Sequence, residues 1–153
     1  MKHLFEYTDY IKENTHNRIE LPILYHGTNN DFDDFDLKFF NSGSGDGGWL
    51  GEGMYFTNDY DYAKSFADRD GVIISAKITL NNPYILTEYA YSINPTKLIR
   101  NLEVFNSNQV TSKLEKMGYD GVLLTYEEDN GDIFYEVCVF NTSSIKIIDK
   151  KYT

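Results

Sequence analysis

The sequence has very little of the residue types on which several classes of protein depend. It contains one cysteine, Cys138, and three histidines among its 153 residues. One cysteine excludes a disulfide framework and a multi-cysteine zinc site, and the apolar strand pattern around it indicates an inert, buried thiol. The histidines His3, His16 and His26 do not have metal-ligand spacing, so the sequence predicts no metal site.

Positive charge and long apolar runs are also scarce. The chain has 14 Lys and Arg side chains against 24 Asp and Glu, for a formal net charge of -10. Because affinity for nucleic acid rests on clustered basic residues, this balance disfavours nucleic acid and favours a partner with a basic surface. No apolar run approaches the roughly 18 residues of a membrane span, and the N-terminal residues lack the apolar core of a signal peptide. We therefore expect a cytoplasmic protein with no membrane partner.

The composition that remains is typical of one folded domain. Hydrophobic residues make up 41% of the chain and aromatic residues 16%, which is enough to bury a core at this length. Residues 3–14 repeat apolar side chains at the period of a helix, with acids and lysine between them. The sequence predicts an N-terminal amphipathic helix within residues 1–18, packed on a domain at residues 19–153. A partner-binding helix is the alternative, because one apolar stripe serves either purpose.

Strand and helix signals over the rest of the chain predict an α+β fold with mainly antiparallel sheets. Asp59 is a helix N-cap signal, and Asn130-Gly131 indicates a hairpin with a type I′ turn. The predicted strands cover residues 19–26, 54–56, 72–80, 121–125, 133–140 and 144–148. The predicted helices cover residues 59–68, 95–105 and 109–117.

Two segments of unusual composition do not by themselves indicate a ligand site. The aspartates between residues 31 and 36 resemble a calcium loop, but the glycine and the terminal glutamate of that loop are missing, which favours a solvated turn. The glycines between residues 43 and 53 suit a loop that wraps a ligand and equally a flexible surface loop. No Walker lysine and no dinucleotide-binding glycine pattern accompanies them, so neither standard phosphate motif is present.

Three short motifs stand at the ends of predicted strands: "YHGT", "GEGMYFTNDYDYAKSFA" and "YEVCVFNTSSIKII". In this order they resemble the ADP-ribosyltransferase superfamily, in the His-Tyr-Glu branch that includes diphtheria-type toxins and the poly(ADP-ribose) polymerases. With "MGYDGVLL" they look most like small single-domain members carried by phages and bacteria, where the cytoplasm would be that of the host cell. The resemblance covers roughly Leu21 to Ile148. It implies a split pair of antiparallel β-sheets enclosing an NAD cleft, with flanking helices.

The resemblance also implies a role for each residue of the first two motifs. Gly27 would hold the nicotinamide carboxamide through its backbone, and His26 would bond the adenosine ribose. Thr28 would support the His-Gly turn or touch the ligand. Tyr55 would stack on the nicotinamide ring, although the pattern alone fits a tyrosine in a core strand equally well. Phe66 would supply a second aromatic ring from the following helix.

Tyr60 and Tyr62 compete with Phe66 for that second aromatic role, because the register of the helix is uncertain by a residue or so. Glu136 would carry the chemistry in this resemblance. Cleaving the nicotinamide–ribose bond develops positive charge on the ribose, and a fixed carboxylate on the 2′-hydroxyl stabilises that charge in the transition state. The pattern alone leaves open an exposed glutamate at the start of a strand.

The resemblance predicts an NAD-dependent mono-ADP-ribosyltransferase acting on a protein acceptor with a basic surface. An NAD glycohydrolase would use the same site with water as acceptor. A catalytically silent member would bind a partner, as an inhibitor, through the acidic and tyrosine-rich surface. The arginine-modifying branch carries Gln or Glu two residues before the catalytic glutamate and Arg in place of the histidine. Phe134 and His26 stand there in this chain, which argues against arginine as the modified residue.

Overall fold

The computed structural model describes residues 18–31, 50–89 and 97–153 of the chain. The predicted N-terminal helix, the predicted acidic turn beyond residue 31 and most of the glycine-dense segment lie outside these ranges. Within the ranges, no helix is both long and apolar enough to cross a lipid bilayer.

Strands dominate the described part of the molecule, and they form one connected, barrel-like sheet. In chain order the strands are β1 (Ile19–Glu20), β2 (Leu24–Thr28), β3 (Met54–Thr57), β4 (Val72–Leu80), β5 (Pro83–Tyr89), β6 (Gly121–Glu127), β7 (Ile133–Val139) and β8 (Ile145–Tyr152). Their spatial order is β1-β4-β2-β3-β7-β6-β5, and β8 pairs with β4. All these pairings are antiparallel except β5 with β6, which confirms the prediction of mainly antiparallel strands.

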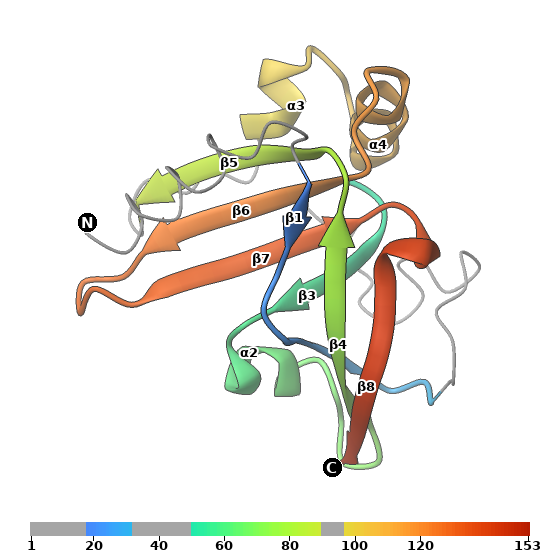
Figure 1. Ribbon diagram of the computed structural model, residues 1–153, viewed down its shortest axis with the longest axis vertical. Helices are drawn as coiled ribbons and strands as arrows, with labels where there is room; N and C mark the ends of the chain where they lie inside the picture. Colours follow the sequence, from blue (N-terminus) through green and yellow to red (C-terminus); the bar gives the residue numbers. More distant parts are fainter. Residues whose placement is uncertain (1–17, 32–49, 90–96) are drawn as a thin grey trace.

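The strands fall into two groups that run across one another, with β3 between them (Figure 1). The first group contains β1, β2, β4 and β8, and the second contains β5, β6 and β7. β3 pairs with β7 from Met54 to Thr57, along the whole strand. Its register with β2 consists of the single pair Tyr25 with Thr57. The two groups are therefore joined firmly on one side of β3 and at one point on the other.

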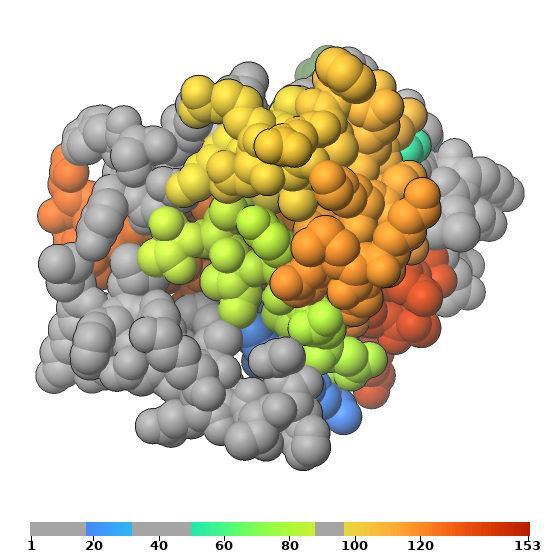
Figure 2. All heavy atoms as spheres, turned by 90° about the horizontal axis from the view of Figure 1, so that it is seen from above, coloured from blue at the N-terminus to red at the C-terminus, as the bar shows by residue number. Residues whose placement is uncertain are grey.

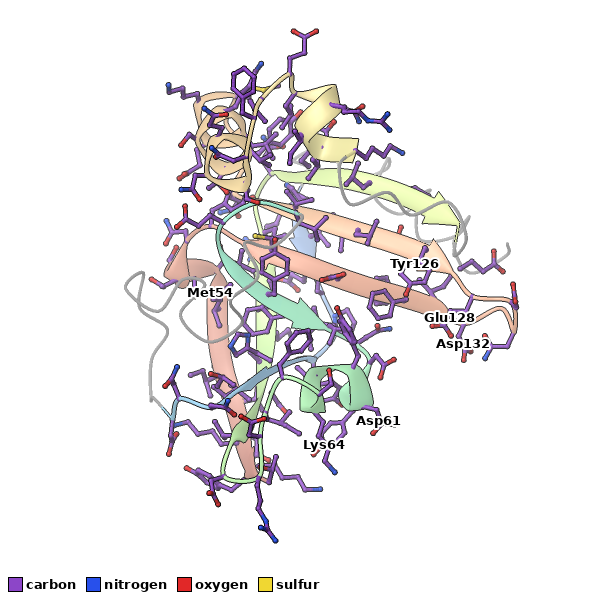
Figure 3. The ribbon with its side chains drawn as sticks, turned by 180° about the vertical axis from the view of Figure 1, so that it is seen from behind. Met54, Asp61, Lys64, Tyr126, Glu128 and Asp132 are labelled. Carbon is purple, nitrogen blue, oxygen red and sulfur yellow. The ribbon has the colours of Figure 1, made fainter. Side chains whose placement is uncertain are left out.

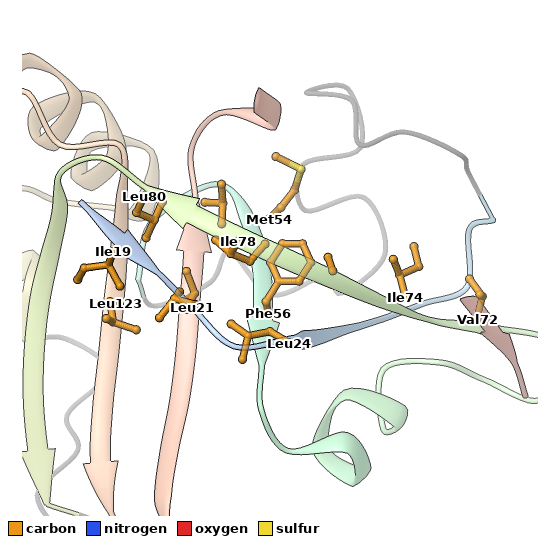
Figure 4. Packing of buried hydrophobic residues seen from close by; sticks show 13 residues of the cluster. Ile19, Leu21, Leu24, Met54, Phe56, Val72, Ile74, Ile78, Leu80 and Leu123 are labelled. Carbon is orange, nitrogen blue, oxygen red and sulfur yellow. The ribbon is translucent and has the colours of Figure 1, made fainter. Parts of the chain in front are cut away.

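The first hydrophobic cluster covers one face of β4, the face that carries the side chains of Val72, Ile74, Ala76, Ile78 and Leu80 (Figure 4). A strand places every second side chain on the same face, so one run of β4 supplies five members of the cluster. Phe56 of β3 and Leu24 of β2 are fully buried among them. The buried members of the cluster are Ile19, Leu21, Leu24, Met54, Phe56, Val72, Ile74, Ala76, Ile78, Leu80, Leu123, Val137 and Val139.

A second cluster lies on the opposite face of β6 and β7, under the helices α3 (Lys97–Asn101) and α4 (Ser107–Lys116). Figure 2 shows these two helices side by side at one end of the molecule. Val110 and Leu114 of α4 are fully buried there. Asn106 caps α4 by accepting a hydrogen bond from the backbone N–H of Gln109 at 3.1 Å. The helices thus cover one end of this face and end before the tip of the β6–β7 hairpin.

The predicted strand at residues 19–26 is wrong in its extent, because the chain forms β1 and β2 there with a break between them. Pro22 lies in the break, and proline has no backbone N–H to give to a ladder. The second strand then continues to Thr28, so His26 lies inside a strand and not beyond its end. β5, which begins at Pro83, was not predicted.

The β6–β7 hairpin has a different turn from the predicted type I′. Glu128 donates its backbone N–H to Asp132 O at 2.8 Å, and Gly131 donates to Glu128 O at 2.9 Å. Gly131 has φ of 88°, whereas Asn130 is not among the residues with positive φ. A type I′ turn needs positive φ at both central residues, so this is a three-residue loop with glycine in the left-handed position. The hairpin was predicted correctly, and its turn type was wrong.

Candidate active site

His26 lies at the point where β2 and β3 diverge. It pairs with Ile74 of β4 in the sheet, and its ring packs at 5.4 Å from the ring of Phe56 on the first cluster's face. Its Nδ1 lies 2.6 Å from the carbonyl oxygen of Tyr55 on β3. The backbone pairing of β2 with β3 stops after Tyr25 and Thr57, and the His26 side chain makes the next contact between the two strands.

That contact fixes the protonation of the His26 ring. A carbonyl oxygen only accepts hydrogen bonds, so Nδ1 must carry the proton and donate it to Tyr55 O. Burial lowers the pKa of His26, and the hydrogen bond to the Tyr55 carbonyl opposes that shift without reversing it. The imidazole is consequently neutral at pH 7, and its Nε2 is a hydrogen-bond acceptor.

Gly27 lies directly under the helix α2 (Tyr60–Lys64), on the face of β2 opposite to His26. A Cβ atom at Gly27 would overlap the carbonyl oxygen of Ala63, so the close approach of α2 requires a glycine here. The same Cβ would lie 3.5 Å from Cβ of Phe66, whose side chain is 43% exposed. Gly27 and Phe66 are therefore neighbours, although they are far apart in the sequence.

Thr28 holds the turn that follows β2. Its hydroxyl accepts a hydrogen bond from the backbone N–H of Asn30 at 3.1 Å, and its side chain is buried. Asn29 then exchanges two hydrogen bonds with Asp68, accepting from its N–H at 2.6 Å and donating to Oδ2 at 2.8 Å. Thr28 therefore supports the turn after β2, whereas His26 and Gly27 lie within the strand; a contact of Thr28 with a ligand stays a prediction.

Asp31 is the one residue of the predicted acidic turn that the structure describes. It accepts hydrogen bonds from Lys150 Nζ at 2.9 Å and from the Tyr152 hydroxyl at 3.0 Å. The hydrogen bond from Lys150 is the main reason that the pKa of Asp31 is lowered. Asp31 thus ties the end of this turn to β8.

The ring of Tyr55 lies on the face of β3 that carries the second cluster, opposite Cys138 of β7. Its hydroxyl donates to Gly51 O at 2.6 Å and accepts from the backbone N–H of Leu50 at 2.9 Å. Burial is the main cause that raises the pKa of Tyr55, so the phenol stays protonated. The hydroxyl therefore anchors the end of the glycine-dense segment to β3.

Glu136 lies inside β7 on the same face, in register with Thr57 of β3 and Leu124 of β6. Its side chain is only 7% exposed, which excludes the alternative of an exposed glutamate at a strand start. Burial is the main cause that raises the pKa of Tyr126 to about 12, and the charges of Glu128 and Glu136 add to the shift. Glu136 is thus a buried acid with aromatic neighbours.

Cys138 follows two residues later on the same face of β7. It is fully buried, and its Sγ lies 3.6 Å from Gly51 O. Burial raises the pKa of this thiol, which opposes formation of the reactive thiolate. The prediction that this thiol is buried is confirmed. Across the described ranges, no group of three or more His, Cys, Asp or Glu side chains is arranged to hold a metal ion.

The strand registers divide the predicted site residues between two faces. Tyr25 pairs with Thr57, and Thr57 pairs with Glu136, so these side chains share one face with Tyr55. His26, the neighbour of Tyr25 along β2, projects to the other face. One contact joins the two faces at the divergence of β2 and β3, where the His26 side chain reaches the backbone of Tyr55.

Sequence reasoning missed a row of aromatic rings beside Glu136. Phe134 lies two residues before Glu136 and therefore on the same face of β7, and its ring is near those of Tyr62 and Tyr126. The two-residue period of β7 was visible in the sequence. The neighbours from α2 and β6 were not, because the tertiary pairing of distant segments brings them there.

A comparison with protein families identifies the family of this chain. A family model described as an ADP-ribosyltransferase in polyvalent proteins matches residues 20–153. The chain belongs to this family. ADP-ribosyltransferase domains in general use NAD as their substrate, so membership supports a transferase that moves ADP-ribose. No curated protein matches the chain.

Proposed function

We propose that this chain is an NAD-dependent mono-ADP-ribosyltransferase of the His-Tyr-Glu type that modifies a protein acceptor. It would act in the cytoplasm, as a small enzyme of bacterial or phage kind. The buried carboxylate of Glu136 carries this proposal, because burying an ionisable group is costly and such groups gather at functional sites.

NAD would bind along the divergence of β2 and β3, where the two groups of strands separate. The nicotinamide ring would lie beside Gly27 and against the exposed ring of Phe66, which gives it an aromatic partner. A ribose hydroxyl would donate a hydrogen bond to Nε2 of His26, which the neutral ring accepts. Tyr55 would border the nicotinamide with its ring while its hydroxyl holds Leu50 and Gly51.

Glu136 would act on the ribose as the nicotinamide–ribose bond breaks. Nicotinamide leaves with the bonding electron pair, and positive charge spreads over C1′ and the ring oxygen of the ribose. The carboxylate accepts a hydrogen bond from the 2′-hydroxyl, and this bond strengthens as the positive charge grows. A nucleophile of the acceptor then bonds to C1′ and loses a proton to solvent.

The acceptor would be a protein with a basic surface. The net charge of -10 opposes the approach of a polyanion and attracts a basic partner. A nucleic acid acceptor is therefore disfavoured. Raising the salt concentration should slow association with the acceptor, because salt screens the attraction.

The decisive experiment follows the fate of labelled NAD. The purified chain is incubated with adenine-labelled NAD and a bacterial lysate, and the Glu136→Gln variant serves as the inactive control. We expect label on a protein band with the wild-type chain and none with the variant. Label recovered only as free ADP-ribose would replace the proposal with NAD hydrolysis. Unreacted NAD under all conditions would leave a silent binding module, and label on an oligonucleotide alone would reject the protein acceptor.

A further inference from the structure

Four aromatic side chains form a continuous row from α2 across β7 to β6, and we call it the aromatic strip: Phe66, Tyr62, Phe134 and Tyr126. The ring centroids of Tyr62 and Phe66 are 5.2 Å apart, and those of Tyr62 and Phe134 are 5.8 Å apart. The rings of Phe134 and Tyr126 are 4.5 Å apart. The row is exposed at its α2 end, where Tyr62 is 39% and Phe66 43% exposed.

The aromatic strip passes the proposed catalytic carboxylate. Phe134 and Glu136 are alternate residues of β7, so their side chains are neighbours on one face. The negative charges of Glu136 and Asp59 both act on the phenol of Tyr126 and help to raise its pKa to about 12, after burial and Glu128. Groups from α2, β6 and β7 therefore surround the same short stretch of surface.

Carboxylates lie beside the aromatic strip in two places. Asp59 and Asp61 lie at the start of α2, and Glu128 and Asp132 lie at the β6–β7 hairpin (Figure 3). None of these four forms an ion pair with lysine or arginine within the part of the chain that the structure describes. Lys64 is the basic residue that shares α2 with Asp61. The border consequently keeps a net negative charge.

We infer that Tyr62, Phe134 and Tyr126 of the aromatic strip, with the acidic border beside them, dock an arginine- or lysine-bearing segment of the acceptor protein, an inference that rests on the proposed function. Phe66, at the end of the strip, is left to the nicotinamide. Cationic side chains bind the faces of aromatic rings, and arginine also stacks flat on them. The carboxylates at the border attract the same charges over a longer range. A segment held on the strip brings a neighbouring nucleophile to the side of Glu136. The docked basic residue and the modified residue are different residues in this arrangement.

Binding of a fluorescent arginine–glycine peptide to the full chain tests the inference. The double variant Asp61→Lys with Glu128→Lys reverses one charge at the start of α2 and one at the β6–β7 hairpin. Its matched control, Glu115→Lys with Asp149→Lys, makes the same change in net charge at exposed sites on α4 and β8. We expect about tenfold weaker binding for the strip variant and a change within about twofold for the control, measured by fluorescence anisotropy.

A third variant separates the rings from the charges. Tyr126→Leu keeps every carboxylate but removes one aromatic face, and we expect about two- to fivefold weaker peptide binding. A glutamate–glycine peptide should not bind to any of these proteins. Thermal unfolding checks that each variant is folded, and NAD binding should stay within about twofold of the wild type in the charge variants.

The outcomes distinguish this inference from the proposed function. Equal weakening by the strip variant and its control, or equal binding of the acidic peptide, would overturn the docking surface even if NAD is cleaved. Peptide binding on the strip in a chain that never cleaves NAD would reject the proposed enzyme and leave the surface as a partner site. A third outcome would support both the docking surface and the proposed enzyme. In it, the wild-type chain labels a basic protein, and the strip variant loses this labelling but keeps its affinity for NAD.

Discussion

The two edges of β3 differ in how much backbone pairing they make. On one edge, β7 pairs with β3 from Met54 to Thr57. On the other edge, the register with β2 is a single residue pair, and the His26 side chain makes the next contact. The closed edge, paired along its whole length, carries Glu136 in a buried position, whereas the open edge is bridged by one residue pair and one side-chain contact. One short strand thus separates a buried acid from a junction with little backbone pairing.

The largest expected effect is a loss of turnover when Glu136, on the strand at the closed edge, is replaced. Glu136→Gln keeps the size of the side chain but removes the charge that the transition state requires, so we expect turnover to fall by about 100- to 1,000-fold. NAD affinity should change only a few-fold, because the lost interaction is made chiefly in the transition state. Turnover and NAD binding are measured separately, with Glu115→Gln on the exposed face of α4 as the control. A loss of turnover below about tenfold would falsify the assignment.

The next effect comes from the helix that covers the open edge. Gly27→Ala would place a Cβ atom against the carbonyl of Ala63, so α2 must move or the fold must lose about 3 kcal/mol of stability. Gly131→Ala is the matched control, because no atom lies within 4 Å of its added Cβ and only its positive φ of 88° is strained. That strain costs about 1 kcal/mol. Chemical denaturation compares the two variants, and equal losses would show that α2 does not press on Gly27.

Tyr55→Phe tests whether the closed edge also holds the glycine-dense segment. The phenylalanine would leave the Leu50 N–H and the Gly51 carbonyl without the hydroxyl that both use. We expect a loss of about 1–3 kcal/mol in the free energy of unfolding. Tyr84→Phe, a half-buried tyrosine whose ring contacts Tyr119, is the control. An unchanged denaturation midpoint for Tyr55→Phe would mean that other groups hold this segment.

The smallest expected effect is the contribution of His26, at the open edge, to the pH dependence of the free energy of unfolding. The folded pKa of His26 is lowered from its ordinary value of 6.5. As the pH falls through 6.5, the unfolded chain therefore gains a proton on His26 that the folded protein does not bind, and stability falls. The contribution of one such group is at most about 1.4 kcal/mol per pH unit.

Denaturation from about pH 7.5 to about pH 5.5 measures this slope, and His26→Asn should reduce it. The sign follows from burial: protonation is penalised only in the folded state, so the penalty is absent above the ordinary pKa. A slope that is identical in wild type and variant would show that His26 titrates alike in the folded and unfolded chains. The open edge would then be more hydrated than its contacts indicate.

Much of the local structure followed from short patterns in the sequence. The strand at Val72–Leu80 matches its predicted limits, because β-branched residues and a buried face fix a strand locally. Asp59 caps α2 as predicted by accepting from the N–H of Tyr62 at 3.0 Å, yet the helix ends at Lys64 and not near residue 68. The N-terminal helix lies outside the described residues and stays a prediction.

The sequence alone determined most of the strands, the Asp59 cap and the membership signals around His26, Tyr55 and Glu136, because each depends on residues that are close along the chain. It did not determine β5 or the break between β1 and β2. Only the tertiary structure decided that β3 is closed on one edge and open on the other, and that Tyr62 of α2 lies against Phe134 of β7. Those contacts join segments far apart in sequence, and the same alternating pattern allows a strand to pair with many partners. The fold selects one set of partners by burying both clusters at once, and that selection decides which residues of distant segments become neighbours.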